Sequence, residues 1–183
     1  MYYNIYFILY QVTGSNKGIG FGIVKELCST FQGVVYLTSR NESLGKASVL
    51  QLNELGLHPK YHQLDINDEA SVLCLRNYLK TTYGGLDVLV NNAAIALLEP
   101  SDMSIGEQAT LTLGTNFFDT NKACKILFPI LKPHARVVNV SSCAGHLTMI
   151  TDQGKEATEL REKLSSQDLT EEELCKLMQN FVE

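Results

Sequence analysis

The sequence predicts an α/β fold with a doubly wound parallel sheet, and three observations favour it. Short apolar segments alternate with helical patterns of ten or more residues, which is typical of βαβ units. A glycine-rich turn joins the first apolar segment to the first helix, and the later segments end in polar side chains. Because crossovers between parallel strands are right-handed, we expect helices on both faces of the sheet.

Composition narrows the class of protein. The chain has 183 residues, 45% of them hydrophobic and 19% charged, so we expect one soluble domain with a sizeable core. A net charge of −5 and the lack of a basic cluster argue against nucleic-acid partners and against binding to an anionic membrane surface. The five cysteines form no C-x-x-C, which favours reduced thiols and a cytoplasmic location. His58 and His62 flank Pro59 and belong to no H-E-x-x-H motif, so we expect no metal site.

The first strand is expected in the apolar run 5–12, which leads directly into the glycine turn. Residues 1–10 have neither a basic region nor a small-residue cleavage site, so we expect no signal peptide. Further β-branched and apolar runs predict strands at 34–39, 61–64, 86–90 and 136–140.

Helical patterns fill the intervals between these strands. After the helix that opens at the glycine turn, helices are predicted at 42–55 and 107–131. Between them, Asn67 or Asp68 can cap a helix that ends at Gly84. Its buried face should carry Val72, Leu75 and Leu79.

The glycine-rich turn carries the first chemical signal. Gly14 permits a sharp turn, Gly18 leaves backbone open to a phosphate, and Gly20 lets the helix pack on the strand. The helix N-terminus then offers unpaired N–H groups to a pyrophosphate. The spacing differs from G-x-G-x-x-G, and no Gly-Lys-Ser/Thr follows, which excludes a Walker loop. The predicted phosphate-binding residues are Gly14, Ser15, Asn16, Lys17, Gly18, Ile19 and Gly20.

Polar residues follow each predicted strand, and a parallel sheet brings such strand ends to one crevice. An NAD site calls for an acidic residue about twenty positions beyond the glycines. The chain instead has Arg40 at the end of the second strand, and Lys17 within the turn. Two cations suit a 2′-phosphate, whereas a carboxylate would repel it. The sequence therefore predicts NADPH rather than NADH as the cofactor.

Five ordered motifs resemble the short-chain dehydrogenases/reductases over nearly the whole chain. They are Thr13-Gly14-x-x-x-Gly18-Ile19-Gly20, Leu64-Asp65-Ile66, Asn91-Asn92-Ala93-Ala94, Asn116 within a long helix, and Val138-Asn139-Val140-Ser141-Ser142. The segment 16–20, the segment 84–90 and the helical residues after Ser142 are similar to the NADPH-dependent carbonyl reductase branch. The resemblance implies a Rossmann-type sheet and the reduction of small aldehydes, ketones or quinones to alcohols by hydride transfer.

The resemblance also implies roles for single residues. Asp65 and Ile66 would contact the adenine, and Asn91 and Ala93 would line the adenosine and ribose end. Ser142 would hydrogen-bond the carbonyl oxygen of the substrate. Asn116 would hold a helix irregularity and a water on the proton path.

The residues after 150 are charged and helical. Residues 155–164 are amphipathic, and Thr170 and Glu173 form a capping box ahead of a helix with one apolar side. We expect a single domain over 1–183, with a cofactor half at 1–142 and a C-terminal helical insert at about 151–183. In the carbonyl reductase branch this insert is associated with monomeric enzymes. Here no later segment is a plausible strand, so the sheet should be incomplete on its C-terminal side, and its free edge favours self-association.

Departures from the family pattern limit the expected activity. No tyrosine is followed four residues later by a lysine, so the Tyr-x-x-x-Lys proton donor of the family is missing. Ala94 replaces a usual glycine, and Gln11 interrupts an apolar strand. We therefore expect an inactive N-terminal fragment of a carbonyl reductase. A non-catalytic NADP(H)-binding module is the alternative, and an interaction protein with an acidic helical tail is a third.

Overall fold

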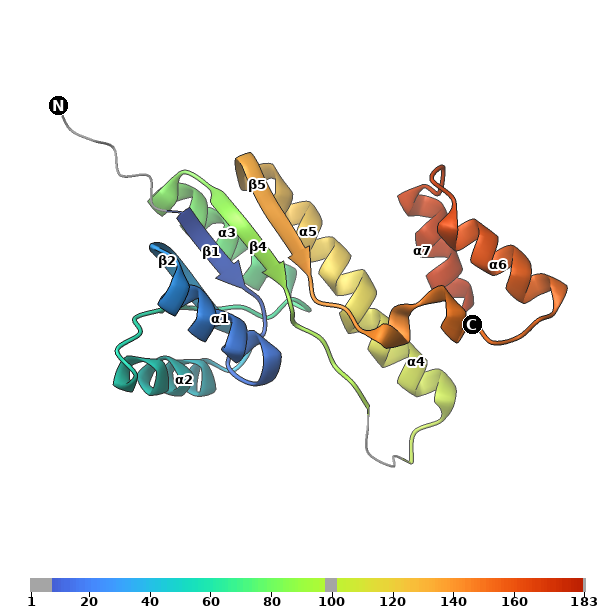
Figure 1. Ribbon diagram of the computed structural model, residues 1–183, viewed down its shortest axis with the longest axis horizontal. Coiled ribbons are helices and arrows are strands. Elements are labelled where there is room, and N and C mark those ends of the chain that lie inside the picture. The colour runs from blue at the N-terminus through green and yellow to red at the C-terminus, as the bar shows by residue number, and fades with distance from the viewer. Residues whose placement is uncertain (1–7, 98–101, 183) are drawn as a thin grey trace. The chain divides into compact units, whose positions relative to one another are not determined.

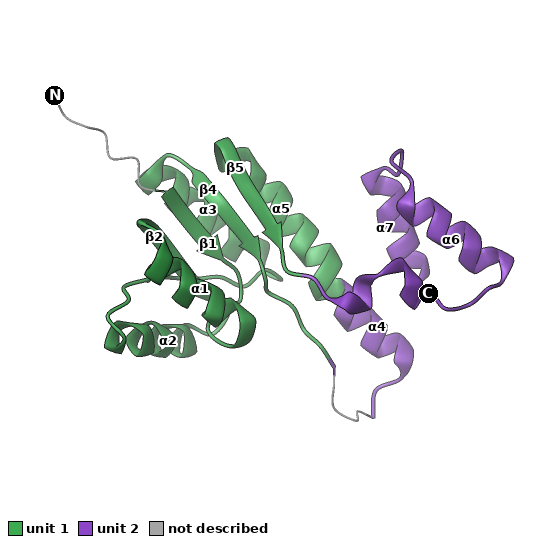
Figure 2. Cartoon of the chain, in the orientation of Figure 1, with its two compact units in different colours: residues 1–96, 114–140 green, residues 97–113, 141–183 purple. Residues whose placement is uncertain are grey.

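The computed structural model describes residues 8–97 and 102–182 (Figure 1). The chain separates into two compact units, which Figure 2 shows in different colours. The first unit comprises residues 1–96 and 114–140 and contains the described sheet. The second unit comprises residues 97–113 and 141–183.

Five strands form the sheet of the first unit, in the order β3-β2-β1-β4-β5. Every pairing between neighbours is parallel, which confirms the predicted doubly wound α/β class. The part of the first predicted strand at 5–7 lies outside the described residues. The strand bounds are Ile8–Val12 (β1), Gly33–Ser39 (β2), Lys60–Gln63 (β3), Leu86–Asn91 (β4) and Leu131–Asn139 (β5).

Helices cover both faces of this sheet. α1 (Gly18–Thr30) and α2 (Glu42–Glu54) pack on one face, and α3 (Glu69–Tyr83) and α5 (Thr120–Leu127) pack on the other. These bounds agree with the predicted helices within a few residues, except in the region before β5. The right-handed crossovers expected from the sequence account for the presence of helices on both faces of the sheet.

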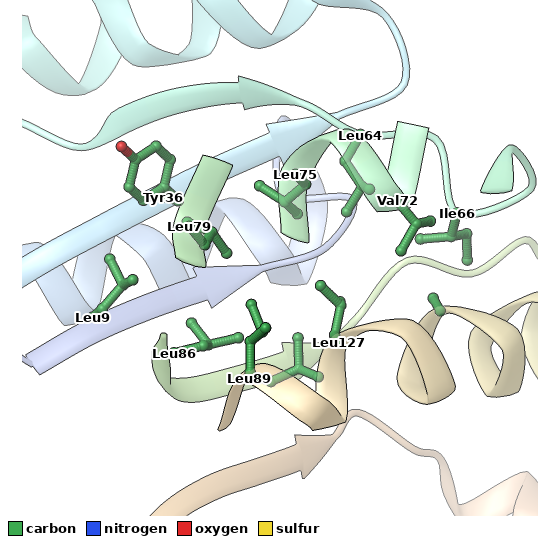
Figure 3. Packing of buried hydrophobic residues seen from close by; sticks show 12 residues of the cluster. Leu9, Tyr36, Leu64, Ile66, Val72, Leu75, Leu79, Leu86, Leu89 and Leu127 are labelled. Carbon is green, nitrogen blue, oxygen red and sulfur yellow. The ribbon is translucent and has the colours of Figure 1, made fainter. Parts of the chain in front are cut away.

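The core consists of two apolar layers, one on each face. Figure 3 shows the layer under α3 and α5, where Leu9 and Leu89 of the sheet meet Leu127 of α5 and the leucines of α3. Val72, Leu75 and Leu79 are buried there, as predicted. Burying a leucine or valine side chain contributes about 1.5–3 kcal/mol. The layer under α1 and α2 contains Tyr10, Val12, Val24, Val35, Leu37, Leu52 and Val90.

Local signals fix the helix ends. The Asn41 side chain accepts a hydrogen bond from the Leu44 N–H at 2.9 Å and caps α2. Asp68 accepts from the Ala70 N–H at 3.0 Å, so of the two caps predicted for α3 it is Asp68 that acts. Gly84 ends α3 with a φ of 73°, a left-handed conformation that favours glycine.

The helix predicted at 107–131 is interrupted. Its residues form α4 (Ile105–Leu113), a π-helical turn (Gly114–Asp119), α5 and a 3-10 turn (Phe128–Ile130). The predicted end at residue 131 is wrong for two reasons. Pro129 has no N–H to donate to a continuing helix, and Leu131 already pairs with Leu86 of β4.

β5 consequently begins at Leu131 rather than at the predicted 136. Between the pairs Leu86–Leu131 and Val88–Arg136, two steps on β4 face five steps on β5, so β5 holds three extra residues in a bulge. His134 within it has a φ of 67°. Among the described residues, β5 pairs only with β4, so the free edge predicted from the sequence is present.

Gln11 lies fully buried in the otherwise apolar strand β1. Its Nε2 donates to Thr38 Oγ1 at 3.3 Å, but its Oε1 has no hydrogen-bond partner in the described part of the chain. A buried acceptor that lacks a donor costs about 1–3 kcal/mol. The cost of the unpaired Oε1 therefore offsets the gain from the hydrogen bond to Thr38.

The second unit is helical, and its long helices are α6 (Lys155–Ser165) and α7 (Glu171–Asn180). The capping box predicted at Thr170 is confirmed, because Thr170 Oγ1 accepts the Glu173 N–H at 3.2 Å and Glu173 Oε2 accepts the Thr170 N–H at 3.0 Å. The Arg161 guanidinium donates to the Ile150 and Asp152 carbonyls at 2.7 Å each, which fixes the chain ahead of α6. Within residues 8–97 and 102–182, no helix combines the length and the apolar character that crossing a membrane requires.

Candidate functional site

A crevice of about 410 Å³ opens in the first unit where the strands end. The segments that follow β1, β2, β3 and β4 all contribute to its wall, as expected for the carboxyl edge of a parallel sheet. Residues selected from the sequence line it as follows: Gly14, Asn16, Lys17, Gly18, Ile19, Gly20, Arg40, Asp65, Ile66 and Ala93. Six wall residues were not selected for the site: Leu64, Asn67, Asn92, Ala94, Ile95 and Thr115.

The glycine turn shapes one side of the crevice. Gly14 and Gly18 have φ values of 58° and 57°, which residues with a side chain rarely adopt. A Cβ on Gly14 would lie 2.8 Å from the Cα of Ala93, so the segment after β4 packs directly on the turn. Apart from the adjoining residues and the backbone of its own helix, no described heavy atom lies within 4 Å of where a Cβ of Gly18 would be. The backbone at Gly18 is therefore open, and the N-terminus of α1 beside it favours an anion.

Thr13 joins the turn to the end of β4. Its Oγ1 accepts hydrogen bonds from the N–H groups of Asn92 at 2.9 Å and Ala93 at 2.8 Å. In return, Asn92 Nδ2 donates to the carbonyls of Thr13 at 2.8 Å and Gly14 at 3.0 Å. Sequence reasoning missed this role, although a threonine between an apolar strand and a glycine is a signal for it.

Ser15 and Asn91, two residues predicted for the site, have side chains that are buried in the first unit. The Ser15 hydroxyl donates to the Val12 carbonyl at 2.8 Å and accepts from the Thr38 N–H at 3.0 Å. Asn91 Nδ2 donates to Asn139 Oδ1 at 2.8 Å and contacts the Cys124 sulfur at 3.2 Å. Both side chains are buried and brace neighbouring strands, and neither is on the wall of the crevice.

Lys17 and Arg40 are exposed on the wall of the crevice, one from the glycine turn and one from the end of β2. Within the described part of the chain, neither side chain lies within ion-pair distance of a carboxylate. No described carboxylate thus pairs with either charge, although Asp65 lies on the same wall. A crevice with two such cations attracts an anionic ligand.

The π-helical turn forms hydrogen bonds to two other segments of the crevice wall, those after β3 and β4. Asn67 Nδ2 donates to Asp119 Oδ2 at 2.6 Å and to Thr115 Oγ1 at 3.1 Å, which holds the segment after β3. Asn116 Oδ1 accepts the Ile95 N–H, and its Nδ2 donates to the Ile95 carbonyl, both at 2.8 Å. The amide of Asn116 therefore pairs with both backbone groups of Ile95 in the segment after β4.

Ser142 belongs to the second unit, where it opens a 3-10 turn (Cys143–Gly145). Its Oγ accepts the Ala144 N–H at 3.2 Å, and its side chain is exposed.

Within the described part of the chain, the residues that line the crevice of the first unit include no tyrosine, histidine or cysteine. That crevice thus lacks a side chain whose ordinary pKa lies between about 6 and 10.

Gly20 and Gly22 of α1 provide a test of the packing around the turn. A Cβ on Gly20 would clash with the Asn92 amide and lie 2.8 Å from the Ser15 Cα, whereas nothing lies within 4 Å of one on Gly22. We expect Gly20→Ala to lower the free energy of unfolding by about 1–3 kcal/mol. The matched control Gly22→Ala should raise it by about 0.5–1 kcal/mol through helix propensity. Urea denaturation followed by circular dichroism measures both, and equal effects would contradict the tight junction.

Comparison with known proteins gives the following similarities. The family model described as short chain dehydrogenase matches residues 9–153. The chain is 50% identical over 172 residues to carbonyl reductase [NADPH] 1 of Bos taurus and 49% identical over 172 residues to carbonyl reductase [NADPH] 3 of Mus musculus. Each alignment covers 94% of this chain and 61% of the relative, so the chain spans about three fifths of the length of these relatives.

Solved structures of two reductases are also similar to this chain. Menthone neomenthol reductase from Mentha piperita matches with a TM-score of 0.80 at 30% identity, over 96% of this chain and 73% of that chain. Salutaridine reductase from Papaver somniferum matches with a TM-score of 0.83 at 29% identity, over 96% of this chain and 69% of that chain.

Proposed function

The chain belongs to the short-chain dehydrogenase family, and we propose that it is the NADPH-binding part of a carbonyl reductase. The reaction is the reduction of small aldehydes, ketones or quinones to alcohols. Bound NADPH supplies the hydride that such a reaction adds to the carbonyl carbon. The two curated relatives are named as carbonyl reductases that use NADPH, which supports this assignment.

The observation that carries the proposal is the crevice at the strand ends with its two cations, Lys17 and Arg40, neither of which forms an ion pair with a described carboxylate. In the proposed complex, these side chains hold the 2′-phosphate of NADPH by charge-assisted hydrogen bonds. The open backbone at Gly18 and the N-terminus of α1 receive the pyrophosphate. Asp65 and Ile66 take the adenine, and Ala93 lines the ribose end.

Ser15 and Asn91 have a supporting part in this proposal. Their buried hydrogen bonds fix the ends of β1, β2 and β4, and through them the backbone that contacts the cofactor. Asn116 likewise sets the position of Ile95 on the wall. We further propose that Ser142 polarises the carbonyl oxygen of the substrate.

We propose that the chain by itself does not turn over substrate. The sequence contains no Tyr-x-x-x-Lys, and the described residues on the wall of the crevice include no side chain suited to proton transfer near neutral pH. The alternative is a binding module that takes up NADP(H) without any reaction. Within the described part of the chain the cysteines form no disulfide, which supports a reducing compartment such as the cytoplasm.

The preference for NADPH over NADH tests the role proposed for Lys17 and Arg40. The chain should bind NADPH more tightly than NADH, because each charge-assisted contact contributes about 1.5–3 kcal/mol. Arg40→Asp should remove most of the discrimination, and the exposed control Lys25→Asp on α1 should leave it unchanged. Isothermal titration with both nucleotides measures this. Equal affinity of the unmodified chain for NADPH and NADH would refute the assignment of the two cations.

Turnover tests the second part of the proposal. With menadione or an aromatic aldehyde, the 183-residue chain should oxidise NADPH at a rate about 10²–10⁴-fold below that of an ordinary reductase, because general acid catalysis is missing. The decrease of absorbance at 340 nm reports the rate, and a carbonyl reductase of full length serves as the positive control. An ordinary rate from this chain would reveal a different proton donor.

The free edge of β5 leads to a proposal about association. Val137 and Val138 are 37% and 47% exposed on this edge strand, so a second copy can add a strand there. We expect dimers or larger species in size-exclusion chromatography with light scattering. Val138→Lys should shift the chain toward monomer, whereas the equally drastic Leu50→Lys on α2 should not. A monomer at all concentrations, or an equal response to both variants, would contradict association through this edge.

A further inference from the structure

Lys60 and Tyr83 form a lysine–tyrosine pair through space, although the sequence has no Tyr-x-x-x-Lys. Lys60 Nζ donates to the Tyr83 hydroxyl at 2.8 Å and lies 5.4 Å from the centre of its ring. Lys60 begins β3 and Tyr83 ends α3. The pair therefore lies at the amino edge of the sheet, opposite to the crevice, and cannot serve a reaction there.

Two further tyrosines complete this cluster. The Tyr36 hydroxyl lies 3.0 Å from the Tyr83 hydroxyl and 2.7 Å from the Tyr78 hydroxyl. Tyr36 is fully buried in β2, so its hydroxyl is held in place by the core. Tyr83 can thus accept one hydrogen bond from an ammonium group and another from a fixed phenol. Both hydrogen bonds favour the deprotonated form of Tyr83.

The direction of the pKa shifts agrees with this geometry. Burial alone would raise the pKa of Tyr83, but the hydrogen bonds from Lys60 and Tyr36 outweigh burial and lower it. Burial and the hydrogen bonds to Tyr78 and Tyr83 raise the pKa of Tyr36, so the charge is expected on Tyr83. His62 is a further ionisable neighbour of this cluster, and its ring lies 5.0 Å from that of Tyr78. In the described part of the chain, no carboxylate forms an ion pair with Lys60.

We propose that Tyr83 is a nucleophilic modification site for electrophiles that carry an activated sulfonyl or acyl group. In the sulfonyl case, the Tyr83 phenolate oxygen forms a bond to sulfur and the leaving group departs with its electron pair. The phenolic proton has gone to solvent beforehand, with Lys60 and Tyr36 stabilising the anion. Part of the Tyr83 side chain remains exposed, so a small aryl reagent can reach it.

Site-resolved labelling of the full chain tests the proposal. The probe is an arylsulfonyl fluoride at pH 7.5, and peptide mass spectrometry gives the rate at each tyrosine. Tyr83 should react at least about fivefold faster than Tyr61, whose hydroxyl has the Ser39 hydroxyl as its neighbour, since each unit of pKa changes the phenolate fraction tenfold. Unfolding the chain in urea should abolish the preference.

Variants separate the proposed role from a structural one. Lys60→Met should reduce the rate at Tyr83 to that at Tyr61 and move the midpoint of its pH–rate profile upward, whereas Lys60→Arg should retain the fast rate. Tyr36→Phe should have a smaller effect in the same direction. Melting curves show whether each variant is folded, and the urea baseline identifies the rate of an unfolded one. Equal labelling of Tyr83 and Tyr61, faster labelling of the more exposed Tyr78, or no effect of Lys60→Met would overturn the proposal.

Discussion

The hydroxyl of Thr13 is the interaction on which the crevice depends. It accepts the N–H groups of Asn92 and Ala93, 79 and 80 residues further along the chain, and so ties the end of β4 to the end of β1. The Asn92 amide returns two hydrogen bonds to the carbonyls of the turn. Because buried amide groups need partners, these bonds specify one arrangement of the two central strands. The wall of the crevice is built outward from this junction.

Polar groups in the first unit divide into two sets. Ser15 and Asn91 are buried, and their hydrogen bonds connect strands. Lys17 and Arg40 stand at the crevice without a carboxylate partner in the described part of the chain. The first set makes the scaffold rigid, and the second keeps its charge available for a ligand. Gln11 belongs to the first set through its hydrogen bond to Thr38 of β2, but in the described part of the chain its Oε1 is buried without a partner.

The fold follows from local patterns, and so does most of the crevice. Periodicity located the helices and strands except in the region before β5, and the rule for parallel strand ends placed Arg40 and Asp65 at one crevice. The hydrogen bonds that fix the wall of the crevice were not predictable, because Thr13 contacts Asn92 only after the sheet has formed. The same applies to Lys60 and Tyr83, which are 23 positions apart and on different elements. Sequence patterns report which side of an element is apolar, but they do not report which distant side chains touch.

The bulge near the start of β5 sets the phase of that strand. Leu131 and its partner Leu86 belong to the layer under α3 and α5, whereas Val88, the partner of Arg136, packs against the layer under α1 and α2. Leu131 and Arg136 therefore face opposite sides of the sheet. The phase after the bulge directs Asn139 toward Asn91 on one face and Val140 toward the layer under α1 and α2 on the other. A slip of one residue in the pairing of 136–139 with β4 would exchange the two faces, whereas the unpaired segment 132–135 can change in length without moving that pairing. This segment is therefore where β5 can gain or lose a residue and keep its buried face.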